Sequence, residues 1–179
     1  YDALYEEFKD DLERWNAIIE KDTLTIRFSS PEILFESGSA VLTPVFKDIL
    51  SDFMPRYLNL LNGRFENQIS EVRIEGHTSS EWGDSVGNPA FIKNMSLSQA
   101  RTRSVLDYSL ELTQLQQIGT WIRKTVSANG LSSARVIYSQ NGLEDRRMSR
   151  RVEFSIRTKT KEALKGVLEK IAPPVTSKI

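Results

Sequence analysis

The chain has 179 residues, with 24 acidic side chains, 24 basic side chains and no cysteine. A chain of this length buries a core without disulfides or metal, which suits one domain with extra elements at its ends. The lack of cysteine excludes disulfides, thiolate metal sites and thiol nucleophiles. The balanced charge gives no indication of nucleic acid or a membrane surface as a partner.

The first 22 residues are predicted to form one amphipathic helix. Its apolar residues are three, four, three and four positions apart, as in a short heptad seam: Tyr5, Phe8, Leu12, Trp15 and Ile19. Such a stripe either packs on the chain's own domain or faces a partner, and two or three heptads do not decide between these alternatives. In the second case, residues 1–22 are a linker and dimerisation helix.

A strand and a helix are predicted next. Alternation with polar residues marks the strand at Leu24, Ile26 and Phe28. Thr43 as N-cap and Pro44 in the first turn mark the start of the helix. The apolar face of this helix comprises Phe46, Ile49, Leu50, Phe53, Tyr57 and Leu61. Pro55 lies inside the pattern and is expected to kink the helix or end it early.

A second strand, a long loop and further helix follow. The strand is expected over Glu71 to His77, and residues 78–93 form a polar loop of a length that often indicates function. Ser96 and Gln99 form a capping box that predicts the next helix start. The helical pattern has a break near residues 111–116 and continues to Asn129-Gly130.

The last predicted elements are two strands and a helix. Val136 and Tyr138 mark a third strand, and the fourth alternates through Val152, Phe154 and Ile156. Residues 163–171 suggest a C-terminal helix. Strands alternating with helices predict a two-layer α/β (α+β) sandwich with the order βαβαββ and a helix at each end. The expected units are the helix of residues 1–22, a domain over 23–158, and a helix and tail over 159–179.

Four segments of this sequence, in order, resemble the OmpA/MotB-like family. They are Ile33-Leu34-Phe35-Glu36-Ser37-Gly38-Ser39-Ala40, Ile74-Glu75-Gly76-His77-Thr78, Leu97-Ser98-Gln99-Ala100-Arg101 and Ser149-Arg150-Arg151-Val152-Glu153. The resemblance covers roughly residues 23–158. It implies a mixed sheet with helices on one face and a groove that binds the peptide stem of peptidoglycan without catalysis or a cofactor.

The resemblance also implies a set of binding residues. An arginine at the position of Arg101 grips a carboxylate of diaminopimelate, and an aspartate after the Gly-His-Thr segment grips its ammonium group. Here that position is Ser79, and a neutral hydroxyl does not replace a charged partner. Glu81 or Asp84 in the same loop are alternative acids. The expected peptidoglycan-binding residues are Arg101, Asn94, Leu97, Ser79, Thr78, Lys93 and Arg151.

The residues themselves agree on Arg101 as the anchor. If the helix begins at Ser96, Arg101 lies in its second turn, where the helix N-terminus adds positive potential for an anion. A guanidinium also makes two parallel bonds to a carboxylate. The alternative is a surface ion pair with Asp107 or Glu75.

His77 and the paired arginines complete the candidates. His77 is the only histidine, so a zinc site is not expected, and we interpret its role as structural, within the loop. Arg150 and Arg151 alternate across a strand, so only one can face the groove. We expect the other to be a surface residue.

The loop over residues 81–93 and the Asn94-Met95 pair resemble the stator B subunits of the Zorya phage-defence system, which are MotB-like. This implies the periplasmic domain of an inner-membrane-anchored protein of a Gram-negative bacterium, a homodimer with a membrane stator partner. The chain begins at Tyr1 and has no apolar run long enough to cross a bilayer, so an anchor is expected upstream. The alternatives are an OmpA-like domain of an outer-membrane protein or lipoprotein, and a wall-cleaving enzyme that uses Glu75, Glu81 or Asp84.

Overall fold

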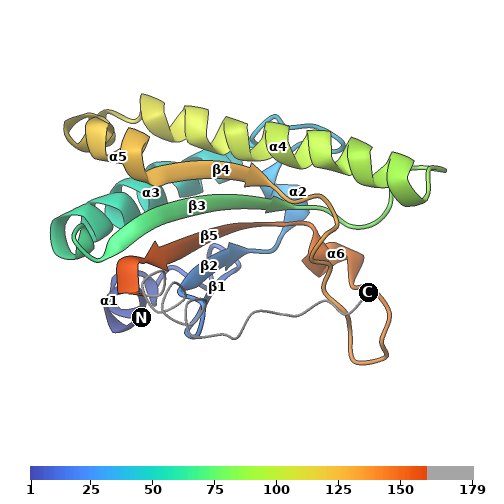
Figure 1. Cartoon of the computed structure of the whole chain (residues 1–179), viewed down its shortest axis with the longest axis horizontal. Helices are drawn as coiled ribbons and strands as arrows, with labels where there is room; N and C mark the ends of the chain where they lie inside the picture. Colours follow the sequence, from blue (N-terminus) through green and yellow to red (C-terminus); the bar gives the residue numbers. More distant parts are fainter. Residues whose placement is uncertain (161–179) are drawn as a thin grey trace, which may run out of the picture.

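The computed structural model describes residues 1–160 and contains a five-stranded mixed sheet in the order β1-β2-β5-β3-β4 (Figure 1). The strands are β1 (Ala17–Glu20), β2 (Thr25–Phe28), β3 (Ile69–His77), β4 (Val126–Gly130) and β5 (Arg151–Thr158). The helices are α1 (Asp2–Phe8), α2 (Pro31–Leu34), α3 (Pro44–Phe65), α4 (Gly87–Glu111), η1 (Thr113–Ile118), α5 (Gly119–Thr125) and α6 (Arg146–Ser149). The predicted mixed α/β class is confirmed, and the sheet has one strand more than expected.

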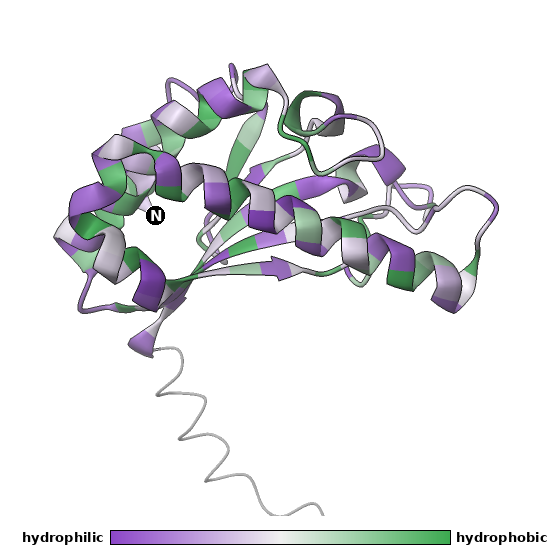
Figure 2. Cartoon of the chain, turned by 90° about the horizontal axis from the view of Figure 1, so that it is seen from above, coloured by the Kyte–Doolittle hydropathy of each residue, from purple (hydrophilic) through white to green (hydrophobic). Residues whose placement is uncertain are grey.

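The two long helices lie on one side of the sheet, and an aromatic cluster fills the space between α3 and the strands. Phe53 of α3 is central to this cluster, with its ring centroid 4.9 Å from that of Phe154 and 5.2 Å from those of Phe28 and Phe8. Along α3 and α4, hydrophilic and hydrophobic residues alternate, as expected for helices with one covered face (Figure 2). The predicted apolar face of α3 is buried at all six positions.

The first 22 residues do not form one helix. Helix α1 ends at Phe8, turns follow, and Ala17–Glu20 is an edge strand antiparallel to β2. Asn16 has a φ of 49°, which a continuous right-handed helix cannot contain. Phe8 and Trp15 are buried in the domain's own core, so the predicted heptad seam is wrong. The dimer remains a prediction, without support from this stripe.

Arg56 of α3 holds the N-terminal segment in place. Its Nε donates to Oε1 of Glu7 and its Nη1 donates to Oδ2 of Asp11, both at 2.7 Å. The guanidinium also lies 4.9 Å from the centre of the Phe8 ring. The segment before β1 is therefore fastened to α3 by charge and by ring contact together.

Helix α3 begins as predicted and extends beyond its expected end. The Thr43 hydroxyl accepts a hydrogen bond from the backbone N–H of Phe46 at 3.1 Å, which caps the first turn. Pro55 lies inside the helix, which nevertheless continues to Phe65. Of the two outcomes expected at Pro55, a kink or an early end, the early end is wrong, because the buried residues on both sides of Pro55 hold the helix against the core and offset the lost hydrogen bond.

Helix α4 begins at Gly87, nine residues before the predicted capping box. Pro89 occupies its first turn, where a missing N–H costs nothing. The Ser96 hydroxyl is inside the helix and donates to the carbonyl of Ile92 at 3.3 Å, so it caps no N-terminus. The predicted long loop shortens to residues 78–86.

The break after α4 is confirmed, and the element that follows it was misassigned. The chain passes through η1 and α5 and then forms β4, parallel to β3, where a continued helix was predicted. The predicted third strand at Val136 and Tyr138 is wrong, because Tyr138 makes only an isolated bridge with Glu144. The fourth predicted strand is confirmed as β5, between β2 and β3. The predicted C-terminal helix lies outside the described residues.

Two paired glycines let α4 approach the sheet closely. Gly76 of β3 and Gly130 of β4 are opposite one another. A Cβ atom on Gly76 would lie 2.7 Å from Cγ2 of Thr102, and one on Gly130 would lie 2.3 Å from the backbone nitrogen of Gln99. Both distances are too short for a real contact, so only glycine allows α4 this position.

We predict opposite effects for two glycine-to-alanine substitutions. Gly130→Ala forces the α4 backbone away from the sheet and should lower the free energy of unfolding by about 1–3 kcal/mol. Gly63→Ala is the matched control, because nothing lies within 4 Å of the added Cβ inside helix α3. It should raise the free energy of unfolding by roughly 0.5–1 kcal/mol. Urea denaturation measures both, and a neutral Gly130→Ala would contradict the close contact.

We also predict that Phe8 belongs to the core of one subunit. Phe8→Ala should lower the free energy of unfolding by about 3–5 kcal/mol, because it leaves a cavity beside Phe53. Tyr5→Ala should change it by less than about 1 kcal/mol, because Tyr5 is 42% exposed. Thermal unfolding at several protein concentrations makes the comparison. A Phe8→Ala chain that keeps its stability but changes its oligomeric state would instead support the predicted dimerisation seam.

Candidate functional site

Arg101 lies in the middle of α4, far from the helix N-terminus. Its Nε donates to the carbonyl of Ser39 at 2.8 Å, and its guanidinium lies 4.8 Å from the centre of the Phe35 ring. Burial, together with the neighbouring charge of Arg150, lowers the pKa of Arg101 to about 10. The expected contribution of the helix N-terminus is therefore wrong, because the helix starts four turns earlier.

Arg101 has no carboxylate partner among residues 1–160. The expected alternatives were Asp107 and Glu75, but Asp107 pairs with Arg103 at 3.4 Å, and Glu75 lies near other arginines. Arg150 is the second cation here, and its buried Nε has no hydrogen-bond partner in the described part of the chain. Two guanidiniums thus lie close together, partly removed from water, with no acid paired to either.

The two arginines line a cavity of about 560 Å³. Its walls come from α2 and the turn that follows it, from α4 and from the residue before β5. The lining residues are Glu32, Phe35, Glu36, Ser37, Gly38, Thr43, Arg101 and Arg150. A carboxylate entering this cavity would meet up to two guanidinium groups, which bind it with paired hydrogen bonds.

Arg150 lines the cavity, whereas Arg151 was the predicted binding residue. Arg151 points to the opposite face of the sheet, where its Nε donates to Oε1 of Glu153 at 2.6 Å. Its side chain is 4% exposed. The sequence predicted that Arg150 and Arg151 point to opposite faces. Which of the two faces the cavity depends on the turn of α6, and the sequence pattern did not show that turn.

The other predicted binding residues do not line the cavity around Arg101. Thr78 and Ser79 are buried, and the N–H of Thr78 donates to the carbonyl of Ser132 at 2.9 Å. Asn94 donates from Nδ2 to the carbonyl of Glu81 at 2.9 Å, and Lys93 donates to the Ser85 hydroxyl. Leu97 is half-buried on α4. Asn94 and Lys93 therefore fasten the loop of residues 78–86 to the helix.

The alternative acids of that loop lie outside the Arg101 cavity. Glu81 pairs with Arg146 at 2.5 Å, and the backbone N–H and the hydroxyl of Ser80 both donate to the Glu144 carboxylate. Asp84 takes part in a bridge with Trp82. These contacts join the loop of residues 78–86 to the segment before β5, and neither Glu81 nor Asp84 lines the Arg101 cavity.

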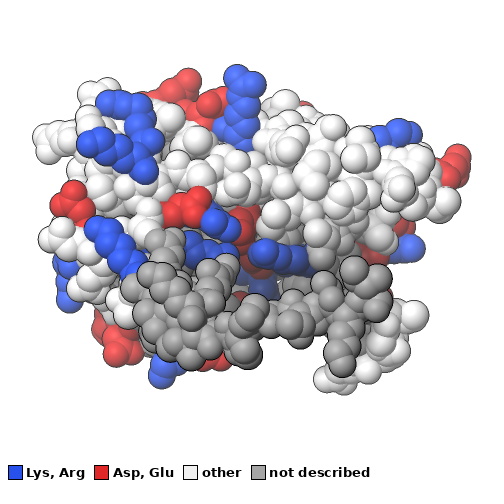
Figure 3. Space-filling model, viewed as in Figure 1, with Lys and Arg blue, Asp and Glu red and all other residues white. Residues whose placement is uncertain are grey.

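The opposite face of the sheet carries a network of ion pairs. Acidic and basic side chains gather in a band across this face (Figure 3). Oε1 of Glu153 accepts from Nε of Arg27 at 2.7 Å and from Nε of Arg151 at 2.6 Å. Although burial alone would raise the pKa of Glu153, hydrogen bonds from His77 and Arg151 hold it well below its usual range.

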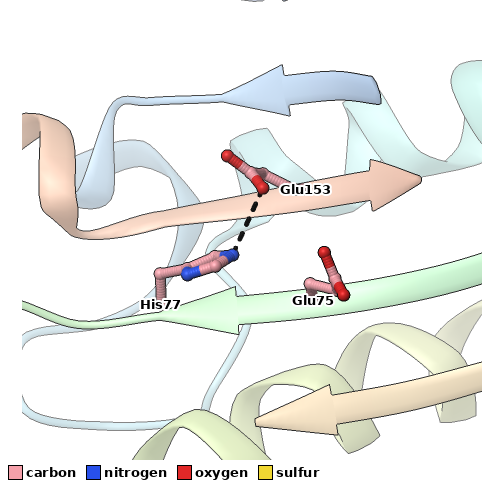
Figure 4. A group of neighbouring side chains, drawn as sticks. All are labelled: Glu75, His77 and Glu153. Atoms are coloured by element: carbon pink, nitrogen blue, oxygen red, sulfur yellow. Dashed lines mark ion pairs between the residues drawn. The ribbon is translucent and has the colours of Figure 1, made fainter. Parts of the chain in front are cut away.

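His77 is the last residue of β3 and belongs to this network, not to the loop. Its Nε2 lies 3.3 Å from Oε2 of Glu153, and Glu75 is beside it (Figure 4). The three side chains offer possible metal ligands within 4.8 Å of one another, and the sequence pattern does not show this group because its members come from two strands. Arginines already neutralise both carboxylates, so the group fits an ion-pair network better than a cation site.

The comparisons with known proteins agree with this geometry. The model of the OmpA family matches residues 34–151, which include every residue that lines the Arg101 cavity except Glu32. The chain belongs to the OmpA family.

A more specific relative is Zorya protein ZorB of Escherichia coli. It is 44% identical to this chain over 170 residues, which is 94% of this chain and 72% of the relative. The predicted Zorya and MotB-like resemblance is thus confirmed.

Solved structures share the fold at lower identity. A MotB-like protein from Desulfovibrio vulgaris has a TM-score of 0.59 at 23% identity, covering 88% of each chain. The cell wall anchor of the T6SS from Pseudomonas aeruginosa has a TM-score of 0.57 at 23% identity, covering 87% of this chain and 97% of that one. The periplasmic domain of Helicobacter pylori MotB has a TM-score of 0.54 at 13% identity, covering 88% and 99%. Within residues 1–160, no helix combines the length and hydropathy required to cross a membrane.

His77 predicts how stability depends on pH. Burial lowers its pKa from 6.5, with the Arg151 charge acting in the same direction and the Glu153 hydrogen bond opposing it. Below about pH 6.5, His77 binds a proton in the unfolded chain but not in the folded chain, so the free energy of unfolding falls as the pH falls. The carboxylates with lowered pKa values affect stability only below their ordinary pKa of 4.5.

We therefore expect a lower melting temperature at about pH 5.5 than at about pH 7.5, with a slope of at most one proton. His77→Gln keeps a donor for Glu153 but does not titrate, so most of this difference should disappear in that variant. Thermal unfolding at both pH values measures the effect. An equal difference in the native chain and in His77→Gln would show that another group causes it.

Proposed function

We propose that the chain binds the peptide stem of peptidoglycan through the Arg101 cavity, without catalysis, and so anchors a membrane complex to the cell wall. The observation that carries the proposal is the pair of partly buried guanidiniums of Arg101 and Arg150, which have no acidic partner among the described residues. An incoming carboxylate would relieve their mutual repulsion and satisfy their free donors. Diaminopimelate stem peptides supply such a carboxylate.

The wider role rests on the family. The 44% identity to Zorya protein ZorB supports a MotB-like, wall-anchoring subunit of an ion-driven stator complex with a phage-defence role. We propose that the chain works as the periplasmic domain of an inner-membrane-anchored homodimer beside a membrane stator partner. Paired cavities on two copies would raise avidity for the wall without new contacts.

A binding role also fits the chemistry of the cavity. Its charged residues are two arginines and two exposed glutamates. The single histidine is in the ion-pair network with Glu153, so it supplies no general base to the cavity. Incubation with purified muropeptides should therefore give no cleavage products, and cleavage would contradict this part of the proposal.

The test is pull-down with purified sacculi that contain diaminopimelate. Arg101→Met keeps an aliphatic side chain against Phe35 but removes the charge, and binding should weaken by roughly 2–5 kcal/mol, which is a loss of 30-fold or more. Arg150→Met should weaken binding in the same direction. The native chain should also bind lysine-containing sacculi less well, because these lack the side-chain carboxylate.

Arg103→Met is the matched control, on the same helix but 81% exposed and outside the cavity. It should bind sacculi like the native chain. Circular dichroism and thermal unfolding confirm that each variant is folded. A folded Arg101→Met chain that retains native binding would refute the proposed site.

A further inference from the structure

The Arg101 cavity also has two acidic residues, one on α2 and one on the turn between α2 and α3. Glu32 and Glu36 both line it. Glu32 is already paired, because Arg147 donates to its Oε1 at 2.6 Å, and this hydrogen bond lowers the Glu32 pKa. The Glu36 side chain has no hydrogen bond or ion pair with any other described residue. Glu36 is therefore the acid that is free to bind a ligand.

The turn that carries Glu36 is tied to Arg101. The N–H of Ser39 donates to the carbonyl of Glu36 at 3.0 Å, and Gly38 adopts a φ of 64°, which closes the turn. The carbonyl of Ser39 in turn accepts from Nε of Arg101 at 2.8 Å. The turn therefore holds Glu36 three residues before Ser39, the residue whose carbonyl accepts the hydrogen bond from Arg101.

The position at which the family resemblance places an acid cannot serve this purpose here. Ser79 is neutral and 3% exposed, and it does not line the cavity. Glu81 in the same loop is paired with Arg146. An ammonium group that enters the cavity with a carboxylate would therefore find its only unpaired acid, among the lining residues, at Glu36.

We propose that Glu36 binds the ammonium group of a zwitterionic amino-acid end while Arg101 and Arg150 bind its carboxylate. This inference rests on the proposed stem-peptide binding and adds the residue that recognises the amine. The balance of charge supports this assignment. One acid and two guanidiniums of the cavity have no ion-pair partner among the described residues, and they complement a ligand end that carries one amine and at least one carboxylate. A carboxylate alone would leave Glu36 beside a like charge.

The test uses isothermal titration calorimetry with the tripeptide L-Ala-γ-D-Glu-meso-diaminopimelate, and with the same peptide acetylated on its free diaminopimelate amine. Acetylation removes the positive charge and should weaken binding to the native chain about tenfold or more. Glu36→Gln should weaken binding of the free amine by a similar factor. It should bind the two peptides equally, because the variant has no charge to recognise the amine.

Glu66→Gln is the control, since Glu66 is an exposed glutamate at the end of α3 and does not line the cavity. It should keep the native preference for the free amine. A Glu36→Gln chain that still prefers the free amine would overturn the assignment while leaving the carboxylate site intact. Tighter binding by Ser79→Asp would overturn it as well, since the amine would then lie near residue 79. Failure of the native chain to bind either the peptide or sacculi would instead refute the proposed function itself.

Discussion

The contact between helix α4 and the paired glycines of β3 and β4 determines where the candidate site lies. Gly76 and Gly130 allow the backbone at Ser98 and Gln99 to rest directly on the sheet. Arg101 follows within one turn, so its position against the turn of residues 36–39 depends on this approach. A side chain at either glycine would lift the helix and separate Arg101 from Arg150 and Phe35, because all three belong to different elements.

The same chain treats its buried charges in two ways. On the opposite face of the sheet, Arg27, Arg151 and His77 surround Glu153, so this buried carboxylate is paired. In the Arg101 cavity, Arg101 and Arg150 have no acidic partner among the described residues. Unpaired charge in a partly buried site costs stability and is retained where a ligand completes it, which is why this cavity, and not the larger network, suggests binding.

Much of the fold was predictable where hydrophobic burial alone determines the spacing of apolar residues in the sequence. Strands β2, β3 and β5 and the buried face of α3 follow from alternation and helical spacing, since apolar residues recur along each at the period of its element. The helix over residues 1–22 failed because Phe8 and Trp15 meet in an aromatic cluster at a separation that also suits a helix. Strand β4 was missed because its sequence, Val-Ser-Ala-Asn-Gly, has too few apolar residues for a strand pattern. Arg101 was found through its motif, whereas Arg150 and Glu36 required the three-dimensional turn that brings them to it.

The clamp of Arg56 on the N-terminal segment has a mechanical consequence. If the chain is held to a membrane upstream and to the wall at Arg101, tension enters at Tyr1 and must pass through α1 before it reaches the sheet. Arg56 of α3 binds Glu7 and Asp11, so the load is shared by a long core helix as well as by the four residue pairs between β1 and β2. Strength under such a pull is set by the rate of unfolding and not by equilibrium stability. The ion pairs of Arg56 would thus carry part of the pulling force and keep the edge strand β1 from separating from β2.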